Sequence, residues 1–260
     1  MPSRTVLIVH AHPEPRSLNA ALKDVAVSTL LDAGHSVEVS DLYSMRWKAA
    51  ADADDFTERQ AGERLRYGAD SRQAFESGTL SADIRDEQAK LVRADALILQ
   101  FPLWWFAPPA ILKGWIDRVM SNGFGYGLMR PGATYSARYG EGTFSGKRAL
   151  VSCTAGGQVP HFSTRGVNGP LADLLFPLTH GMLFYAGFSV LEPFAVHGAN
   201  RVSDQQFELL ADAYRARLAG LFDESPIAYR SQNGGDYDND LCLKPGLEGA
   251  LTGLAIHRRP

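Results

Sequence analysis

Three consecutive aromatic residues, Trp104, Trp105 and Phe106, come shortly after the apolar run 96–99 and directly after Pro102 and Leu103. A turn of this kind offers a flat apolar wall together with free backbone N–H and C=O groups. Three neighbouring aromatic side chains do not all face one way, so core packing alone does not account for them. A flavin ring needs both features, because it stacks on its faces and is hydrogen-bonded at its pyrimidine edge. The turn therefore predicts a ligand wall.

A polar cluster of His12, Ser17 and Asn19 follows another apolar run, at residues 5–10. Ser17 is a suitable cap for a helix running to about residue 33, whose first N–H groups would face this loop. Helix N-termini of this type bind phosphate. The loop has neither GxGxxG nor a Walker lysine, so we expect these side chains and backbone amides to hold phosphates. Purely local capping by Ser17 is the competing interpretation.

Two glycine-rich segments follow later elements. Gly156 and Gly157 come directly after the apolar run 148–153, where a Gly-Gly pair lets the backbone approach a ligand closely. The segment 122–127 also contains Tyr126, which would act either as a mobile cover over a pocket or as part of a plain connection.

Five strand-like segments alternate with helical patterns along the first 222 residues: apolar runs at 5–10, 96–99, 148–153 and 187–191, and an alternating segment at 35–40. Continuous apolar runs are typical of strands buried on both faces of a parallel sheet, and alternation is typical of a strand with one buried face. We predict an α/β fold, a flavodoxin-like, doubly wound sheet of five parallel strands with helices on both faces. Residues 223–260 are expected to be an irregular extension packed on the domain or on a dimer partner. The ends of parallel strands meet at one edge, which would bring the three motifs together.

Composition excludes several classes of protein. The net charge is -3 and the basic residues are scattered, which argues against nucleic-acid binding. Cys153 and Cys242, the only cysteines, give neither a disulfide framework nor a metal signature. No apolar stretch reaches the ~18 residues of a transmembrane segment, and the N-terminus lacks the pattern of a signal peptide. We expect a cytoplasmic protein.

Several blocks of the sequence resemble the NAD(P)H:quinone oxidoreductase family of flavoproteins, the DT-diaphorase type, over nearly the whole chain. They are VLIVHAHPEPRSLN (6–19), SDLYSM (40–45), FPLWWFAPPAILKGWIDRV (101–119), TAGG (154–157), RGVNG (165–169) and FPLTHGMLFYAGFSVLEP (176–193).

The resemblance implies a homodimer with one non-covalent FAD in a crevice of each subunit. Residues that would meet the phosphates and the adenosine part are His12, Leu18 and Asn19, with Ser17 as the cap. Residues that would line the isoalloxazine ring are Pro102, Leu103, Trp104, Trp105 and Phe106. Residues that would bond its pyrimidine edge are Thr154, Ala155, Gly156 and Gly157. Tyr126 would lie across the pocket of the other subunit.

The implied reaction is a two-electron ping-pong transfer from NAD(P)H to the flavin and then to a quinone. The sequence departs from the family at two positions expected beside the part of the flavin that becomes negatively charged on reduction. Phe162 replaces the family's tyrosine there, and Asn168 replaces its histidine. Asn168 donates a hydrogen bond but does not shuttle a proton near neutral pH. Neighbouring His161 would substitute if its loop rotated. Asparagine at this position also occurs in a branch that prefers small dihydronicotinamides, which weighs against efficient NAD(P)H use.

Three further expectations concern the cofactor and the role. His180 matches one position of a metal site in that branch, but the expected second histidine is Phe184, so we predict no metal. The first alternative function is an FMN-dependent azo or nitro reductase on the same fold. The second is a flavin-binding ancillary or regulatory subunit of a transporter.

Overall fold

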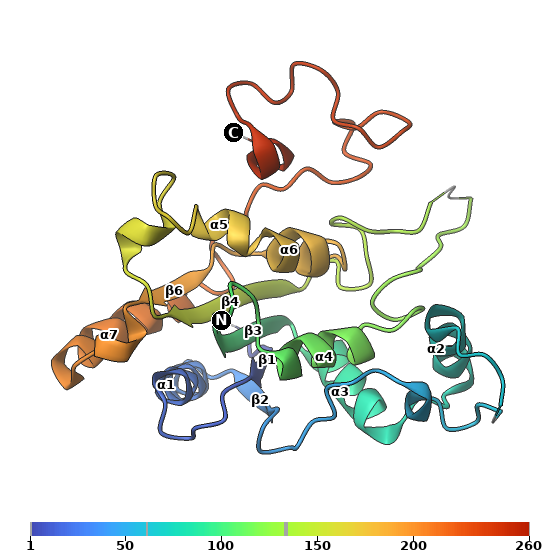
Figure 1. The fold of residues 1–260 in the computed structure, drawn as a ribbon, viewed down its shortest axis with the longest axis horizontal. Helices are drawn as coiled ribbons and strands as arrows, with labels where there is room; N and C mark the ends of the chain where they lie inside the picture. Colours follow the sequence, from blue (N-terminus) through green and yellow to red (C-terminus); the bar gives the residue numbers. More distant parts are fainter. Residues whose placement is uncertain (1, 61, 133–134, 260) are drawn as a thin grey trace.

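A computed structural model describes residues 2–60, 62–132 and 135–259, and its strands form one parallel sheet in the order β2-β1-β3-β4-β5, with β6 also paired to β4 (Figure 1). The strands are β1 (Thr5–His10), β2 (Ser36–Asp41), β3 (Ala96–Pro102), β4 (Arg148–Ala155), β5 (Ser189–Val190) and β6 (Phe194–His197). The α-helices are α1 (Leu18–Asp32), α2 (Tyr67–Ser77), α3 (Ala82–Arg93), α4 (Ala110–Val119), α5 (Leu171–Leu174), α6 (Phe176–Leu178) and α7 (Asp204–Ala219). Shorter turns are the 3-10 helices Ala53–Asp55, Val159–Phe162, Ala199–Arg201 and Gly253–His257, and the π-helix Thr179–Phe184.

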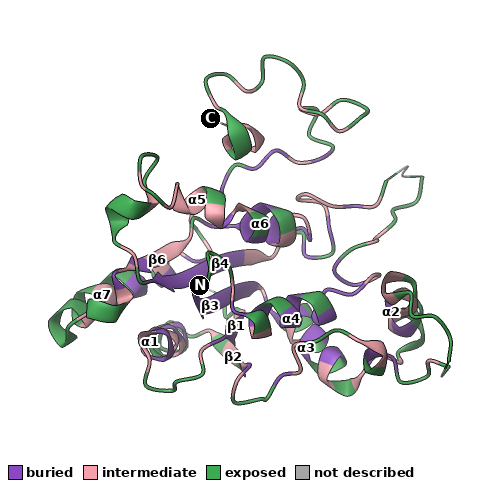
Figure 2. Ribbon diagram, in the orientation of Figure 1, coloured by how far each residue is buried: buried purple, intermediate pink, exposed green. Residues whose placement is uncertain are grey.

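The sheet separates two hydrophobic cores because successive side chains of a strand point to opposite faces. In β1, Val6 and Ile8 pack with α1 and α7, whereas Leu7 and Val9 pack with α3, α4 and the segment 175–188. Figure 2 shows the buried strands between these helices. The predicted flavodoxin-like fold class is confirmed.

The predicted fifth strand over residues 187–191 is wrong in its bounds. Only Ser189–Val190 pairs there, with the first residues of β4. After Glu192 and Pro193 a second short strand, β6, pairs with the last residues of β4 on the same side. Proline has no N–H to donate to the ladder, which explains the break. The last helix of the domain, α7, begins after its cap Ser203, whose side chain accepts from the Gln206 amide.

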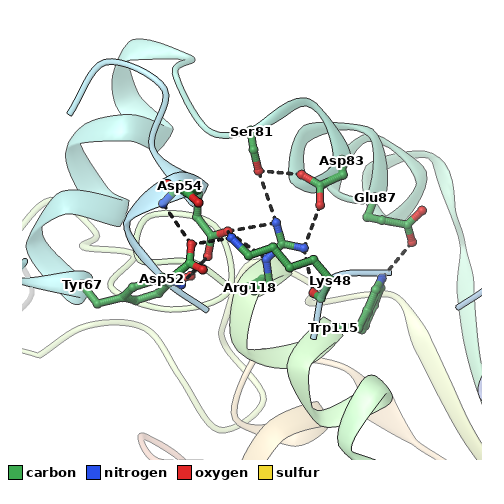
Figure 3. A network of polar contacts seen from close by, with 10 residues as sticks. Lys48, Asp52, Asp54, Tyr67, Ser81, Asp83, Glu87, Trp115 and Arg118 are labelled. Carbon is green, nitrogen blue, oxygen red and sulfur yellow. Dashed lines mark hydrogen bonds and ion pairs between the residues drawn. The ribbon is translucent and has the colours of Figure 1, made fainter. Parts of the chain in front are cut away.

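The long connection between β2 and α3 is anchored by a buried ion pair. The Arg118 side chain on α4 is 1% exposed, and its Nε donates to Asp55 Oδ1 at 3.0 Å. The same guanidinium lies 2.7 Å from Asp83 Oδ2, donates to the Lys48 carbonyl, and stacks over the Trp47 ring. Figure 3 shows Arg118 at the centre of this network. The network fixes the polar segment that follows β2 against α3 and α4.

The C-terminal extension leaves the domain after a short docked stretch (Figure 1). The Ile227 amide donates to the Val190 carbonyl at 2.7 Å, and the Tyr229 hydroxyl is 2.8 Å from Thr179 Oγ1. Within residues 2–60, 62–132 and 135–259, no helix is both long enough and apolar enough to cross a bilayer.

Replacing Asp55 by asparagine is expected to lower the free energy of unfolding by about 3 kcal/mol, because the buried Arg118 charge then keeps only the partly exposed Asp83 as an anion. Denaturant unfolding at fixed protein concentration measures this. The matched control is Asp117→Asn, which breaks the exposed pair with Lys113 and should cost less than about 1 kcal/mol. Equal effects of the two substitutions would contradict the anchoring role.

Candidate functional site

The predicted phosphate loop and the aromatic turn lie together at the carboxyl edge of the sheet. The chain order reverses between β1 and β3, and ligands of open α/β sheets bind at such a switch point. A pocket of about 280 Å³ is present there and is called the loop pocket. Its lining residues are His12, Ser17, Leu18, Asn19, Pro102, Leu103, Trp104, Thr154, Gly156, Ala199 and Asn200.

A second pocket, of about 310 Å³, adjoins the first and is called the aromatic pocket. Its lining residues are Leu103, Trp105, Phe106, Ala155, Gly156, Gly157, Phe162 and Asn168. Leu103 and Gly156 line both pockets, so the two form one crevice. The structure thus brings together, along this crevice, all thirteen residues that the sequence analysis assigns to cofactor binding.

The aromatic turn holds its side chains out of the core. Trp105 is 97% exposed, and both Trp105 and Phe106 have left-handed backbone angles, with φ of 50° and 60°. Paired hydrogen bonds between Trp104 and Ala107 close the turn. Left-handed backbone at bulky residues costs about 1–2 kcal/mol each, and such strain gathers at ligand sites. The arrangement therefore favours a ligand or partner over core packing.

The side chain of Asn19 is buried beneath the crevice and hydrogen-bonded on both sides. Its Nδ2 donates to Thr154 Oγ1 at 2.8 Å, and its Oδ1 accepts from Gln100 Nε2 at 2.9 Å. Ser17 caps α1, since its Oγ accepts from the Ala20 amide. The Asn19 amide thus ties the N-terminus of α1 to β3 and β4, and this role is visible only in the fold.

The Gly-Gly pair lies where a side chain has no room. A Cβ on Gly157 would lie 2.8 Å from the ring of Phe162. The Phe162 ring in turn packs against His197, with ring centroids 5.0 Å apart. Burial lowers the pKa of His197, which favours its neutral form. The wall formed by Phe162, at the position of the family's tyrosine, is therefore apolar.

The loop carrying Asn168 is held by backbone bonds to His161. The Asn168 amide donates to the His161 carbonyl at 3.0 Å. The His161 ring does not line either pocket, and its Nδ1 accepts from the Gln158 amide at 3.3 Å. Asn168 is therefore the polar side chain that this loop presents to the aromatic pocket.

Tyr126 lies away from the crevice of its own chain. Its hydroxyl faces Gly68 of α2, and its backbone carbonyl accepts from the Gly123 amide at 2.8 Å. The Arg72 side chain bonds the next carbonyl, that of Gly127, at 3.0 Å. The turn is thus fixed against α2.

Thiol chemistry is not available at the base of the crevice. Cys153 precedes Thr154 on β4, and burial raises the pKa of its thiol to about 12. It remains protonated near neutral pH and is closed off from reagents.

Sequence reasoning missed Ala199 and Asn200, which complete the loop pocket. They follow β6, the strand that the sequence analysis did not identify. A signal was present, because the apolar residues Phe194–Val196 follow Pro193 and end at Gly198, which has a left-handed φ of 65°.

The residues of the crevice fit a flavin nucleotide. The 15-residue helix α1 directs its N-terminus at the loop pocket, which suits phosphate. Exposed aromatic rings form the wall of the adjoining pocket. A Cβ at Gly157 would collide with the ring of Phe162, so glycine keeps this part of the pocket open. Within the described ranges, no cluster of three or more His, Cys, Asp or Glu suited to a metal occurs.

Comparisons with known proteins agree with this geometry. A family model for the flavodoxin-like fold matches residues 4–218. The chain is 48% identical over 257 residues to the ribosyldihydronicotinamide dehydrogenase-like protein traD of Penicillium crustosum, covering 98% of this chain and 95% of that protein. It is 41% identical over 228 residues to the ribosyldihydronicotinamide dehydrogenase (quinone) of Homo sapiens, covering 87% and 96%. A solved structure from Klebsiella pneumoniae, described as that of a proposed quinone reductase, has a TM-score of 0.94 and 53% identity, and the match covers 98% of this chain and 100% of that one.

Replacing Thr154 by valine is expected to lower the free energy of unfolding by about 1–3 kcal/mol, because the buried Asn19 amide loses its acceptor. Thr154→Ser keeps the hydroxyl and should lose clearly less. Both are measured by denaturant unfolding. If serine and valine cost the same, the hydrogen bond is not what stabilises the crevice.

Proposed function

Because the chain belongs to the NAD(P)H:quinone oxidoreductase family with the flavodoxin-like fold, we propose that it is an FAD-dependent enzyme that reduces quinones. The observation that carries the proposal is the continuous crevice, in which a helix N-terminus and an aromatic wall share Leu103 and Gly156. The loop pocket extends to Ala199 and Asn200, and this extent supports a dinucleotide over FMN.

In this proposal, bound FAD would take a hydride from a dihydronicotinamide and pass two electrons to a quinone in a ping-pong sequence. The chain's own part is binding and orientation. The phosphates would be held by His12, Ser17, Leu18 and the first backbone amides of α1. Asn19, buried beneath them, would keep the start of α1 in place. The aromatic turn and the backbone of residues 154–157 would hold the ring, and Leu103 would keep water from its face.

The electron donor is proposed to be a small dihydronicotinamide in preference to NAD(P)H. Asn168 and Phe162 line the aromatic pocket. The side-chain amide of Asn168 is a hydrogen-bond donor, whereas the ring of Phe162 has no hydroxyl. An amide stabilises developing negative charge but does not transfer a proton. Two relatives that share 48% and 41% of their residues with the chain carry the name ribosyldihydronicotinamide dehydrogenase, which supports this donor.

A homodimer is proposed as the working form. The Trp105 side chain is almost fully exposed at the mouth of the aromatic pocket, which favours burial against another molecule. Tyr126 packs beside Gly68 of α2 and lines neither pocket of its own chain, so its proposed place over a crevice is in a second subunit.

The decisive experiment is an absorbance spectrum of the purified protein, followed by anaerobic addition of donor and then of menadione. We expect a flavin spectrum that bleaches faster with dihydronicotinamide riboside than with NADPH and returns with menadione. Flavin released by denaturation should be FAD, and release of FMN would overturn that assignment. Absence of flavin even after FAD is added would overturn the enzyme proposal and favour a binding subunit.

Replacing Phe162 by tyrosine is expected to speed flavin reduction roughly two- to tenfold, since it adds one hydrogen-bond donor beside the ring edge. Stopped-flow measurement of the reductive half-reaction tests this. Val167→Thr, at a 91% exposed position of the same loop, is the matched control and should leave the rate unchanged. An unchanged rate in Phe162→Tyr would place the ring edge elsewhere.

Replacing Asn168 by leucine should slow the same half-reaction by a similar factor, because it removes the donor that this loop presents. Asn168→Ser retains a shorter donor and should lose less. A leucine variant with the parental rate would remove Asn168 from the mechanism.

A further inference from the structure

A pocket outside the crevice lies between the end of β6 and the first two turns of α7, and it is called the helix pocket. Its volume is about 310 Å³, within the range of small-molecule sites. None of its lining residues lines the loop pocket or the aromatic pocket. The helix pocket is therefore a separate cavity, which the proposed flavin site does not use.

The floor of the helix pocket is fixed to the back of the aromatic pocket. The Gly198 amide donates to the Gly157 carbonyl at 2.9 Å, and the His197 ring packs against Phe162. Gly198 has a left-handed φ of 65°, and the end of the Gln158 side chain lies 2.8 Å from the place of a Cβ. Glycine thus allows the Gln158 side chain to lie directly over the backbone. The floor is held by these contacts before any ligand binds.

Aliphatic side chains from α7 and the residue before its cap form one wall. They are Val202, Leu209 and Leu210. Val202 and Leu210 rest on the hydrophobic core between the sheet and α7, whereas Leu209 is 67% exposed and belongs to neither core. This wall has no aromatic ring, in contrast to the aromatic pocket. It suits a compact saturated group better than a flat ring.

Arg201 gives the helix pocket a positive charge. Arg215 and Arg217 on α7 each pair with a carboxylate, whereas no carboxylate of the described residues lies within ion-pair distance of the exposed Arg201. Among those residues, no aspartate or glutamate lines the pocket. Burial lowers the pKa of His197, which favours its neutral form. The charge that remains near neutral pH suits an anion, and the planar guanidinium matches a carboxylate.

We propose that the helix pocket is a second binding site, for a small aliphatic carboxylate. The carboxylate would pair with Arg201, and the saturated group would lie on Val202, Leu209 and Leu210. The site needs no flavin, and it therefore stands or falls separately from the proposed activity.

A ligand-observed NMR titration of the protein as purified tests the charge with two probes of equal size, cyclohexanecarboxylate and cyclohexanecarboxamide. We expect the carboxylate to bind about two- to fivefold more tightly, the factor that an exposed ion pair supplies. Arg201→Gln should abolish the difference between the probes. The matched control is Arg215→Gln, which removes another partly exposed arginine of the same region and should leave the difference intact.

The apolar wall is tested by a third probe and a second variant. Acetate lacks the saturated ring and should bind about tenfold more weakly than cyclohexanecarboxylate. Leu209→Ser should weaken both cyclohexane probes about three- to tenfold, because it removes the exposed part of the wall. Its matched control is Leu31→Ser, at a 52% exposed position of α1, which should leave binding unchanged.

Equal binding of the two cyclohexane probes to the parent protein, or binding of neither, would overturn the proposal. Added FAD should leave cyclohexanecarboxylate bound. Its release by FAD, or loss of FAD binding in Arg201→Gln, would assign Arg201 to the crevice and would also overturn the proposal. A protein that binds no flavin but still prefers the carboxylate would support the helix pocket while contradicting the proposed activity.

Discussion

The side-chain amide of Asn19 is the contact on which the crevice depends. One buried group bonds Thr154 on β4 and Gln100 on β3 while sitting in the first turn of α1. These three elements carry the phosphate loop, the aromatic turn and the Gly-Gly pair. A buried amide that lacks either partner would pay its desolvation cost in full, so the three elements are held in one relative position. This contact therefore joins the start of α1 to β3 and β4 directly beneath the crevice.

The crevice is built from residues that are individually unfavourable to folding. Trp105 and Phe106 expose large apolar rings on left-handed backbone, and Gly157 has no side chain to pack. The buried ion pair of Arg118 and Asp55 anchors α4 to the connection that follows β2. The buried amide of Asn19 anchors the elements beneath the crevice itself. Strained aromatic residues held on firmly anchored elements are typical of a preformed binding surface.

Much of the fold and of the crevice could be predicted from the sequence, because strand ends, helix caps and glycine pairs act locally. The Ser17 cap and the position of Gly156 and Gly157 beside the crevice are of this kind. The split of the last strand was missed, because a two-residue strand has no periodicity to detect. Ala199 and Asn200 were missed with it. The role of Asn19 depends on partners 81 and 135 residues away, and no local pattern reports such contacts.

The division of the outer strand into β5 and β6 also affects the tendency of the protein to aggregate at high concentration. An uninterrupted outer strand presents a line of unpaired N–H and C=O groups to any passing chain. Here β5 and β6 are two and four residues long and are separated by Leu191, Glu192 and Pro193, so this outer edge offers only short templates. A charge and an imino acid in the gap act as gatekeepers against strand addition. The irregularity that hid β6 from sequence reasoning thus disfavours strand addition at this edge of the sheet.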